Sequence, residues 1–202
     1  MEGLIFYWIS WMVWIIATFF MARTNKYRFL LSAWVLCLMI MSPLTVNILN
    51  FEIGIAVLFL LASLYAFAGR LKKLSKLYFL FCTFILMMAY VTFHLFELFD
   101  PVWVIFSREW MLSVLMVYMA VLLQKNRMLR LPLILLGGIQ GEFLYAFILK
   151  SFSFPYTIGS LAFLDIMAIS ISISSLWIAV HWTVKYIEAN FKHFEREKQK
   201  LS

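Results

Sequence analysis

The sequence has few charged residues and few residues that interrupt helices. Asp, Glu, Lys and Arg make up 13% of the 202 residues, about half of their share in an ordinary soluble domain. Seven glycines and four prolines leave little material for loops and turns, whereas hydrophobic residues make up 65%. This composition excludes both a soluble globular protein and a disordered chain, and it predicts an integral membrane protein.

Cysteines and catalytic motifs are also scarce. Cys37 and Cys82 each lie inside an apolar run, without the spacing of a metal or redox motif, and we interpret them as buried thiols. The chain lacks zinc-protease, nucleophile-elbow and phosphate-loop patterns. His94, Glu97 and Asp100 share a helix face but offer too few ligands for a metal. These absences argue against an enzyme and predict no metal and no cofactor.

Seven apolar runs are each long enough to cross a bilayer, which takes about 20 residues in a helix. None shows the alternation of apolar and polar positions that a membrane β-barrel requires. The runs cover residues 3–22, 29–49, 51–68, 77–98, 102–123, 131–149 and 159–182. The sequence therefore predicts an all-α polytopic bundle of seven transmembrane helices in residues 1–182, followed by a tail in residues 183–202.

The basic residues predict how the bundle is oriented. Fifteen of the 17 Lys and Arg residues lie in the connections after the first, third and fifth runs and in the tail. They are Arg23, Lys26, Arg28, Arg70, Lys72, Lys73, Lys76, Lys125, Arg127, Arg130, Lys185, Lys192, Arg196, Lys198 and Lys200. Because short basic loops stay in the cytoplasm, we expect a multi-pass plasma-membrane protein with its N-terminus outside and its C-terminus in the cytoplasm.

Several residues predict details of the helices. Pro43 lies inside the second run, where a proline is expected to kink the helix. Asp100 and Pro101 are expected to cap and begin the fifth helix. Gly137 and Gly141 have the spacing that lets two membrane helices approach closely, and we favour packing within the bundle over dimerisation.

The tail has the pattern of a basic amphipathic helix. Ile187, Phe191 and Phe194 fall on one helical face among basic residues. Such a helix is expected to lie on the inner leaflet and contact anionic lipids. A docking site for a cytoplasmic partner is the alternative. The net charge of +7 is therefore explained by topology and lipid contact, and no nucleic acid partner is expected.

Ionisable residues inside the runs are the candidate functional residues, because each costs at least about 2.5–3.5 kcal/mol at mid-depth. In order, they are Arg108, Glu109, Glu142 and Asp165. Counted from the expected helix ends, Arg108, Glu142 and Asp165 share a layer about 10–15 Å deep. His94 and Glu97 share one face of the fourth helix, nearer the surface.

Two interpretations of these residues remain open. In the first, they line an outward-facing polar cavity or ion pathway in which Arg108 pairs with Glu142 or Asp165. In the second, they make structural contacts: Arg108 reaches the headgroups if the fifth helix begins near Ser107, Glu109 is interfacial, and Glu142 bonds to a neighbouring helix.

Short aromatic segments resemble a known family. They are Met1-Glu2-Gly3, Phe6-Tyr7-Trp8 with Ser10-Trp11, and Ile105-Phe106-Ser107-Arg108-Glu109-Trp110. The chain resembles the YphA-type integral membrane proteins of spore-forming Gram-positive bacteria in these segments, in length and in number of spans. The resemblance implies a bacterial plasma-membrane protein of unassigned activity, and it implies no reaction, ligand or catalytic residue.

Three classes of function are compatible with these features. An accessory or scaffold protein, acting on a membrane protein partner through helix contacts and the tail, is slightly favoured because the loops are short. The alternative is a small transporter, channel or sensor that uses the polar layer between helices 4 to 7. An intramembrane enzyme is the third class.

The predicted topology can be tested with single cysteines placed in residues 69–76 and 150–158. A membrane-impermeant maleimide should label the second site on intact cells and the first only after permeabilisation, because the basic connection is expected in the cytoplasm. Labelling of the first site from outside intact cells would contradict the orientation.

Overall fold

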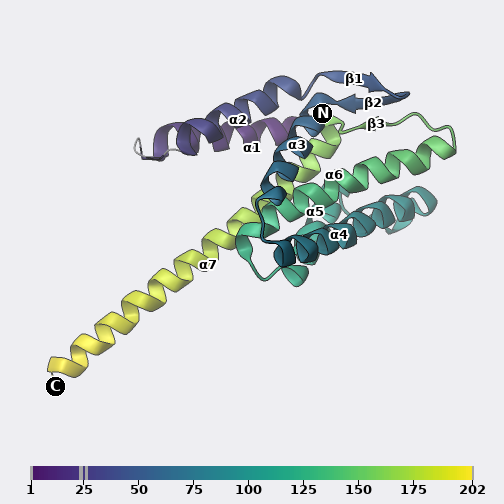
Figure 1. The fold of residues 1–202 in the computed structure, drawn as a ribbon. Helices are drawn as coiled ribbons and strands as arrows, with labels where there is room; N and C mark the ends of the chain where they lie inside the picture. Colours follow the sequence, from purple (N-terminus) through teal and green to yellow (C-terminus); the bar gives the residue numbers. More distant parts are fainter. Residues whose placement is uncertain (1, 23–24, 26, 202) are drawn as a thin grey trace.

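The computed structural model describes residues 2–22, 25 and 27–201, and these form seven α-helices and one small sheet (Figure 1). The helices are α1 (Leu4–Ile15), α2 (Tyr27–Met41), α3 (Ile55–Gly69), α4 (Lys73–Phe99), α5 (Arg108–Leu123), α6 (Arg127–Ser151) and α7 (Leu161–Leu201). The strands are β1 (Thr45–Ile48), β2 (Phe51–Gly54) and β3 (Thr157–Ile158). A π-helical turn, η1 (Ile16–Phe20), continues α1, and a 3₁₀ turn, η2 (Pro101–Trp103), follows α4. Arg23 and Lys26 of the first basic connection lie outside the described residues.

Helix α6 lies at the centre of the bundle. It packs along α4 more extensively than any other two elements pack together, and it also contacts α3, α5 and α7. Leu133, Ile134, Leu136 and Ile139 of α6 are completely buried. Small and apolar residues between Leu133 and Gly141 are buried on several sides of α6, which allows neighbouring helices to pack around it.

The glycines of α6 set how closely α4 approaches. A Cβ atom added at Gly141 would lie 2.7 Å from the Tyr90 ring, and one added at Gly137 would lie 2.6 Å from Cβ of Leu86. Both glycines thus face α4 inside the bundle. Small residues at these positions permit the close contact through which membrane helices gain packing energy.

The second predicted helix is wrong at its C-terminal end. Helix α2 ends at Met41, so Pro43 follows the helix and does not kink it. Proline lacks an N–H and disfavours helical backbone in the residue before it. The chain therefore leaves the helix at Ser42, although its side chains remain apolar.

A β-hairpin occupies the remainder of that run and the start of the next. Strand β1 pairs antiparallel with β2, with Ile48 opposite Phe51. Leu49 and Asn50 between them have φ angles of 52° and 64°, as a two-residue type I′ turn requires. Thr45 and Val46 are β-branched and favour extended backbone. Residues 51–54, predicted as helix, are thus a strand.

Helix α5 begins later than predicted. The carboxylate of Asp100 accepts a hydrogen bond from the backbone N–H of Val102 at 3.2 Å, so it caps the turn η2, in which Pro101 is the first residue. Helix α5 itself begins at Arg108, with Ser107 at its N-cap position. The predicted start at residue 102 is therefore wrong, because the cap and proline serve a separate short turn.

Three helices are long and apolar enough to cross a membrane: α4, α6 and the part of α7 from Leu161 to Lys185. The apolar helices Leu4–Phe20, α2 and α3 are shorter, and α5 has 16 residues. The molecule is thus largely helical, with seven helices among its described residues.

Helix α7 extends away from the bundle to Leu201 (Figure 1). The predicted tail is therefore a continuation of the last helix, with no break at residue 183. Ile187 is exposed. The side chains of Phe191 and Phe194, which define the predicted apolar face with it, lie outside the described residues.

The three strands lie together at one end of the bundle, which we call the sheet end. Strand β2 pairs parallel with β3, and the Thr157 hydroxyl donates a hydrogen bond of 3.0 Å to the Glu52 carboxylate. Lys150 Nζ donates to the carbonyl of Leu49 at 2.9 Å and lies 3.8 Å from the centre of the Phe51 ring. These contacts connect the hairpin to the end of α6 and to β3.

The close contact between α4 and α6 predicts that Gly141→Ala destabilises the protein. The added methyl group would contact the fully buried Tyr90 ring, and such overpacking costs about 1–3 kcal/mol before the better helix propensity of alanine offsets about 1 kcal/mol. Gly69→Ala is the matched control, since a Cβ atom there meets nothing within 4 Å. Thermal unfolding in mild detergent should show a lower midpoint for Gly141→Ala only. Equal midpoints would contradict this packing.

Candidate ligand-binding site

A polar pocket of about 570 Å³ opens at the sheet end. It lies between α4, the first turn of α5, α6, the segment leading to β3, and the start of α7. Its polar and charged lining includes Tyr90, His94, Glu97, Arg108, Tyr145 and Tyr156. The pocket thus collects side chains from segments that are distant in the sequence, which is typical of a binding site.

His94, Glu97 and Arg108 form a chain of ionisable groups along the pocket. Nδ1 of His94 lies 3.4 Å from one carboxylate oxygen of Glu97, three residues further along α4. The other carboxylate oxygen lies 3.9 Å from a terminal nitrogen of Arg108. The imidazole lies between two aromatic rings, with centroid distances of 4.6 Å to Tyr90 and 4.9 Å to Tyr145. Stacking and the carboxylate together orient the imidazole.

Two nitrogen atoms of this chain have no hydrogen-bond partner among the described residues. They are Nε2 of His94 and Nε of Arg108, and both are buried. The His94 side chain as a whole is only 7% exposed. Leaving a buried polar group unsatisfied costs about 1–3 kcal/mol, so these two atoms are unusual in an otherwise satisfied region.

Glu142 is completely buried beside the pocket and accepts three hydrogen bonds. The Tyr90 hydroxyl donates to one carboxylate oxygen at 2.5 Å. The Tyr156 hydroxyl and the backbone N–H of Gly159 donate to the other, at 2.9 and 3.2 Å. These donors come from α4 and from the segment around β3, whereas Glu142 lies on α6. Its contacts therefore join three parts of the fold.

The surroundings of Glu142 depend on two local features. Gly159 has a φ of +74°, and a Cβ atom there would lie 2.2 Å from Val57, so only glycine can place this N–H beside the carboxylate. Burial, followed by the nearby Glu142 carboxylate, raises the pKa of the Tyr156 phenol. The phenol accordingly stays protonated and remains a hydrogen-bond donor at physiological pH.

Asp165 occupies a different environment from Glu142. Its two carboxylate oxygens accept hydrogen bonds from the backbone N–H groups of Gly3 at 2.6 Å and Phe6 at 2.7 Å. Asp165 thus holds the first turn of α1 against α7 and acts structurally. The expected pairing of Arg108 with Glu142 or Asp165 is wrong, because Arg108 lies beside Glu97 and the two acidic groups are bound by other donors.

The depth predicted for Arg108 is also wrong, and Glu109 lies at the same helix end. Both lie in the first turn of α5, because the helix begins at Arg108. A carboxylate in the first turn interacts favourably with the helix dipole, and this interaction explains why an acidic residue stands at position 109. Arg108 is 39% exposed and reaches the pocket from the helix end.

Sequence analysis missed the tyrosines of this site. Tyr90 and Tyr145 could not be distinguished from the other aromatic residues, of which the chain has 38 in total, and Tyr156 lies in a short loop. A signal was present, since Tyr90, His94 and Glu97 recur at spacings of four and three on one face of α4. Tyr156 had no such signal, because only folding brings β3 beside α6.

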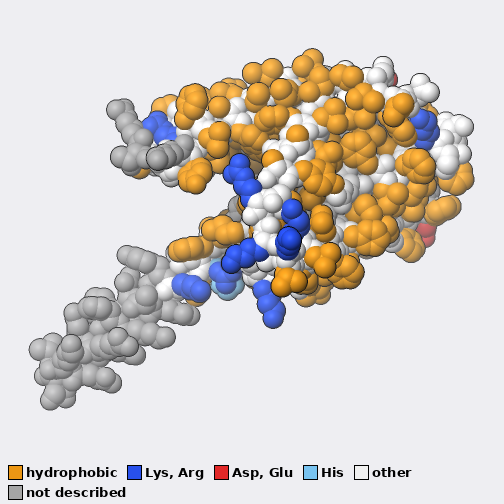
Figure 2. Space-filling model, in the orientation of Figure 1, with side chains coloured by type: hydrophobic (Ala, Val, Ile, Leu, Met, Phe, Trp, Pro, Cys, Tyr) orange, Lys and Arg blue, Asp and Glu red, His pale blue; other side chains and the backbone are white. Residues whose placement is uncertain are grey.

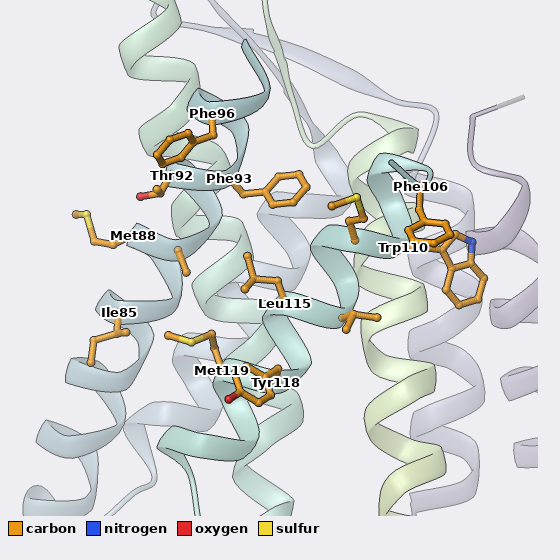
Figure 3. A pocket seen from close by; sticks show the side chains of 13 residues that line it. Ile85, Met88, Thr92, Phe93, Phe96, Phe106, Trp110, Leu115, Tyr118 and Met119 are labelled. Atoms are coloured by element: carbon orange, nitrogen blue, oxygen red, sulfur yellow. The ribbon is translucent and has the colours of Figure 1, made fainter. Parts of the chain in front are cut away.

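An apolar groove of about 910 Å³ lies between α4 and α5 (Figure 3). Phe93 and Phe96 of α4 line it, as do Phe106 and Trp110 on its α5 side, and Figure 3 shows Phe93 directed toward α5. Its walls contain few polar atoms, in contrast to the polar pocket. Among the described residues, no group of three or more His, Cys, Asp or Glu side chains could hold a metal ion.

The contacts of Glu142 predict that Tyr156→Phe destabilises the protein. It removes one donor to the buried Glu142 side chain, and leaving a buried acceptor unsatisfied costs about 1–3 kcal/mol. Tyr65→Phe is the control, because the Tyr65 hydroxyl accepts its bond from Gln140 at an exposed position. Thermal unfolding in detergent should show the larger decrease for Tyr156→Phe. A decrease no larger than that of the control would show that the hydrogen bond from Tyr156 to Glu142 does not stabilise the protein.

Comparison with known proteins agrees with the membrane assignment. The model of the family described as YphA-like integral membrane protein matches residues 2–200. The uncharacterized protein YphA of Bacillus subtilis (strain 168) is 30% identical over 165 residues, which is 82% of this chain and 81% of that protein. No solved structure matches. The resemblance predicted from the aromatic segments is confirmed, and the chain belongs to the YphA-like integral membrane protein family.

Proposed function

We propose that this protein crosses the bacterial plasma membrane seven times and binds a small polar solute in the polar pocket, as a small transporter or sensor. The N-terminus and the sheet end face outward, and the C-terminus is cytoplasmic. The gathering of polar side chains from α4, α5, α6 and the β3 segment in one cavity carries the proposal. Its volume falls within the about 300–1,000 Å³ typical of small-molecule sites.

The distribution of charge supports this orientation. Most Lys and Arg side chains visible in Figure 2 gather where α7 leaves the bundle, away from the sheet end. They belong to the connections between α3 and α4 and between α5 and α6, and to α7 itself. Basic groups in short loops are retained on the cytoplasmic side, so the opposite end, with Glu52 and Glu97, is the outer one.

The shorter helices are compatible with seven spans. Helices α2, α3 and α5 have 15 or 16 residues and are about 22–24 Å long, which is less than the about 30 Å of a bilayer core. A short span is tolerated by local thinning of the bilayer at modest cost. The hairpin and η2 then lie in the outer interface, where water can satisfy their backbone groups.

The tail of α7 is proposed to contact the inner leaflet. Residues 183–202 contain five basic residues and three acidic ones, and the helix continues without a break to Leu201. Attraction to anionic lipids is worth about 1 kcal/mol per basic residue near the surface.

An accessory or scaffold role is the second candidate, and the apolar groove favours it. The groove between α4 and α5 is wide enough to admit side chains of a transmembrane helix from a partner protein. Gly137 and Gly141 are already used against α4, so the groove is the better surface for such a partner. In this role the polar pocket would be a structural feature without a ligand.

A matched pair of alanine substitutions distinguishes the two candidates. Ala162 lines the polar pocket and Ala89 lines the apolar groove, so leucine at either position narrows one cavity and leaves the other intact. In a thermal unfolding screen of anionic, cationic, zwitterionic and neutral solutes, we expect at least one to stabilise the wild type and Ala89→Leu but not Ala162→Leu. A solute at 100 times its dissociation constant adds about 2.7 kcal/mol.

Two results would overturn solute binding. One is the absence of any stabilising solute, and the other is equal stabilisation of Ala162→Leu. A stoichiometric membrane partner that co-purifies with the wild type and Ala162→Leu, and is lost with Ala89→Leu, would establish the accessory role instead.

A further inference from the structure

We infer that the molecule held in the polar pocket carries an oxyanion, a carboxylate or a phosphate, which Arg108 and His94 bind together. This inference rests on the proposed function, since it specifies the chemistry of the ligand at the same site. The inference adds that the ligand is negatively charged and that two residues, Arg108 and His94, bind this charge.

Arg108 has unused capacity to bind an anion. Its guanidinium carries five N–H donors in a planar fork, and the ion pair with Glu97 is a single contact of 3.9 Å, too long for a hydrogen bond. The Nε atom is buried without an acceptor. An oxyanion can accept two parallel hydrogen bonds from this fork, which is the strongest arrangement available to arginine.

His94 lines the same pocket and also has a ring nitrogen without a partner. Glu97 lies against Nδ1, while Nε2 is buried without a partner. The rings of Tyr90 and Tyr145 prevent the imidazole from turning away. In its imidazolium form both nitrogens donate, so Nε2 can bind an oxyanion while Nδ1 stays against Glu97.

The acidic groups inside the pocket wall are already engaged. Glu142 accepts three hydrogen bonds, and Glu97 lies between His94 and Arg108, whereas Glu2 also lines the pocket but is exposed. Among the described residues of the pocket, the buried side-chain atoms without partners are nitrogens of basic side chains. The unmet requirement of the pocket is therefore for acceptor oxygens.

The size and walls of the pocket indicate what bears the oxyanion. A cavity of about 570 Å³ is much larger than a bare inorganic anion, which fits a molecule of metabolite size. Tyr145, Tyr156 and Phe163 supply aromatic surface for its body. The oxyanion can come from a soluble small molecule or from the headgroup of an anionic lipid, because both present the same oxygen atoms.

The test compares ligands that share a phenyl group and carry either an oxyanion or a neutral amide. The purified full-length protein in mild detergent would be titrated with phenylacetate, phenyl phosphate and the neutral phenylacetamide, while thermal unfolding is followed. A lipid arm compares nanodiscs of phosphatidylglycerol and phosphatidylcholine. We expect an oxyanion probe to stabilise the wild type, and Arg108→Gln and His94→Gln to weaken its binding at least tenfold.

Two variants of other basic positions control for charge and folding. Lys150→Gln removes the other basic residue of the sheet end, where it contacts Leu49 and Phe51 outside the pocket, and should bind the probe as the wild type does. Arg108→Lys keeps the charge but loses the fork, so it should fold and bind with intermediate affinity. Variants are compared only when they are monodisperse.

Each outcome has a defined meaning. Equal binding of phenylacetamide and phenylacetate, or equal loss in Arg108→Gln and Lys150→Gln, would overturn the inference. Binding of a neutral solute that Ala162→Leu abolishes would overturn it while leaving the proposed function intact. Stabilisation by phosphatidylglycerol alone, dependent on Arg108, would support the oxyanion but replace the soluble solute by a lipid. No stabilisation by any probe or lipid would overturn it.

Discussion

The interaction on which the sheet end depends is the burial of the Glu142 carboxylate among three donors. A carboxylate without solvent is stable in a low-dielectric interior only when its oxygens are hydrogen-bonded. Tyr90, Tyr156 and Gly159 supply those bonds from two other parts of the chain. Removing any one of them leaves a buried acceptor less satisfied, so the positions of α4, α6 and the β3 segment are coupled through one side chain.

The polar pocket is a consequence of this arrangement. Because the hydroxyls of Tyr90 and Tyr156 bond to Glu142, both side chains are fixed where their rings also line the cavity. The Tyr90 ring approaches α6 closely because Gly141 has no side chain. The same ring lies against His94, whose orientation in turn positions Glu97 and Arg108. Packing between α4 and α6 and the chemistry of the pocket are therefore not separable.

Several parts of the fold could be predicted from the sequence, and the errors have physical causes. Apolar runs indicate helices in a membrane because the bilayer leaves the backbone few alternatives. That argument fails in residues 42–54, where side chains stay apolar but Pro43 and the turn at Leu49 and Asn50 direct the backbone into a hairpin. It also misplaced the start of α5, since Asp100 and Pro101 begin a separate turn.

Composition and local pattern are enough to identify a mainly helical membrane protein of the YphA-like family and to single out its ionisable residues. Which of those residues meet depends on how the helices pack against one another. Asp165 accepts hydrogen bonds from the N-terminal backbone, Glu142 accepts them from two tyrosines, and Arg108 lies beside Glu97. Depth along a helix can be counted from sequence only where the helix ends are predicted correctly, and the direction in which each helix faces depends on contacts between segments far apart in the chain.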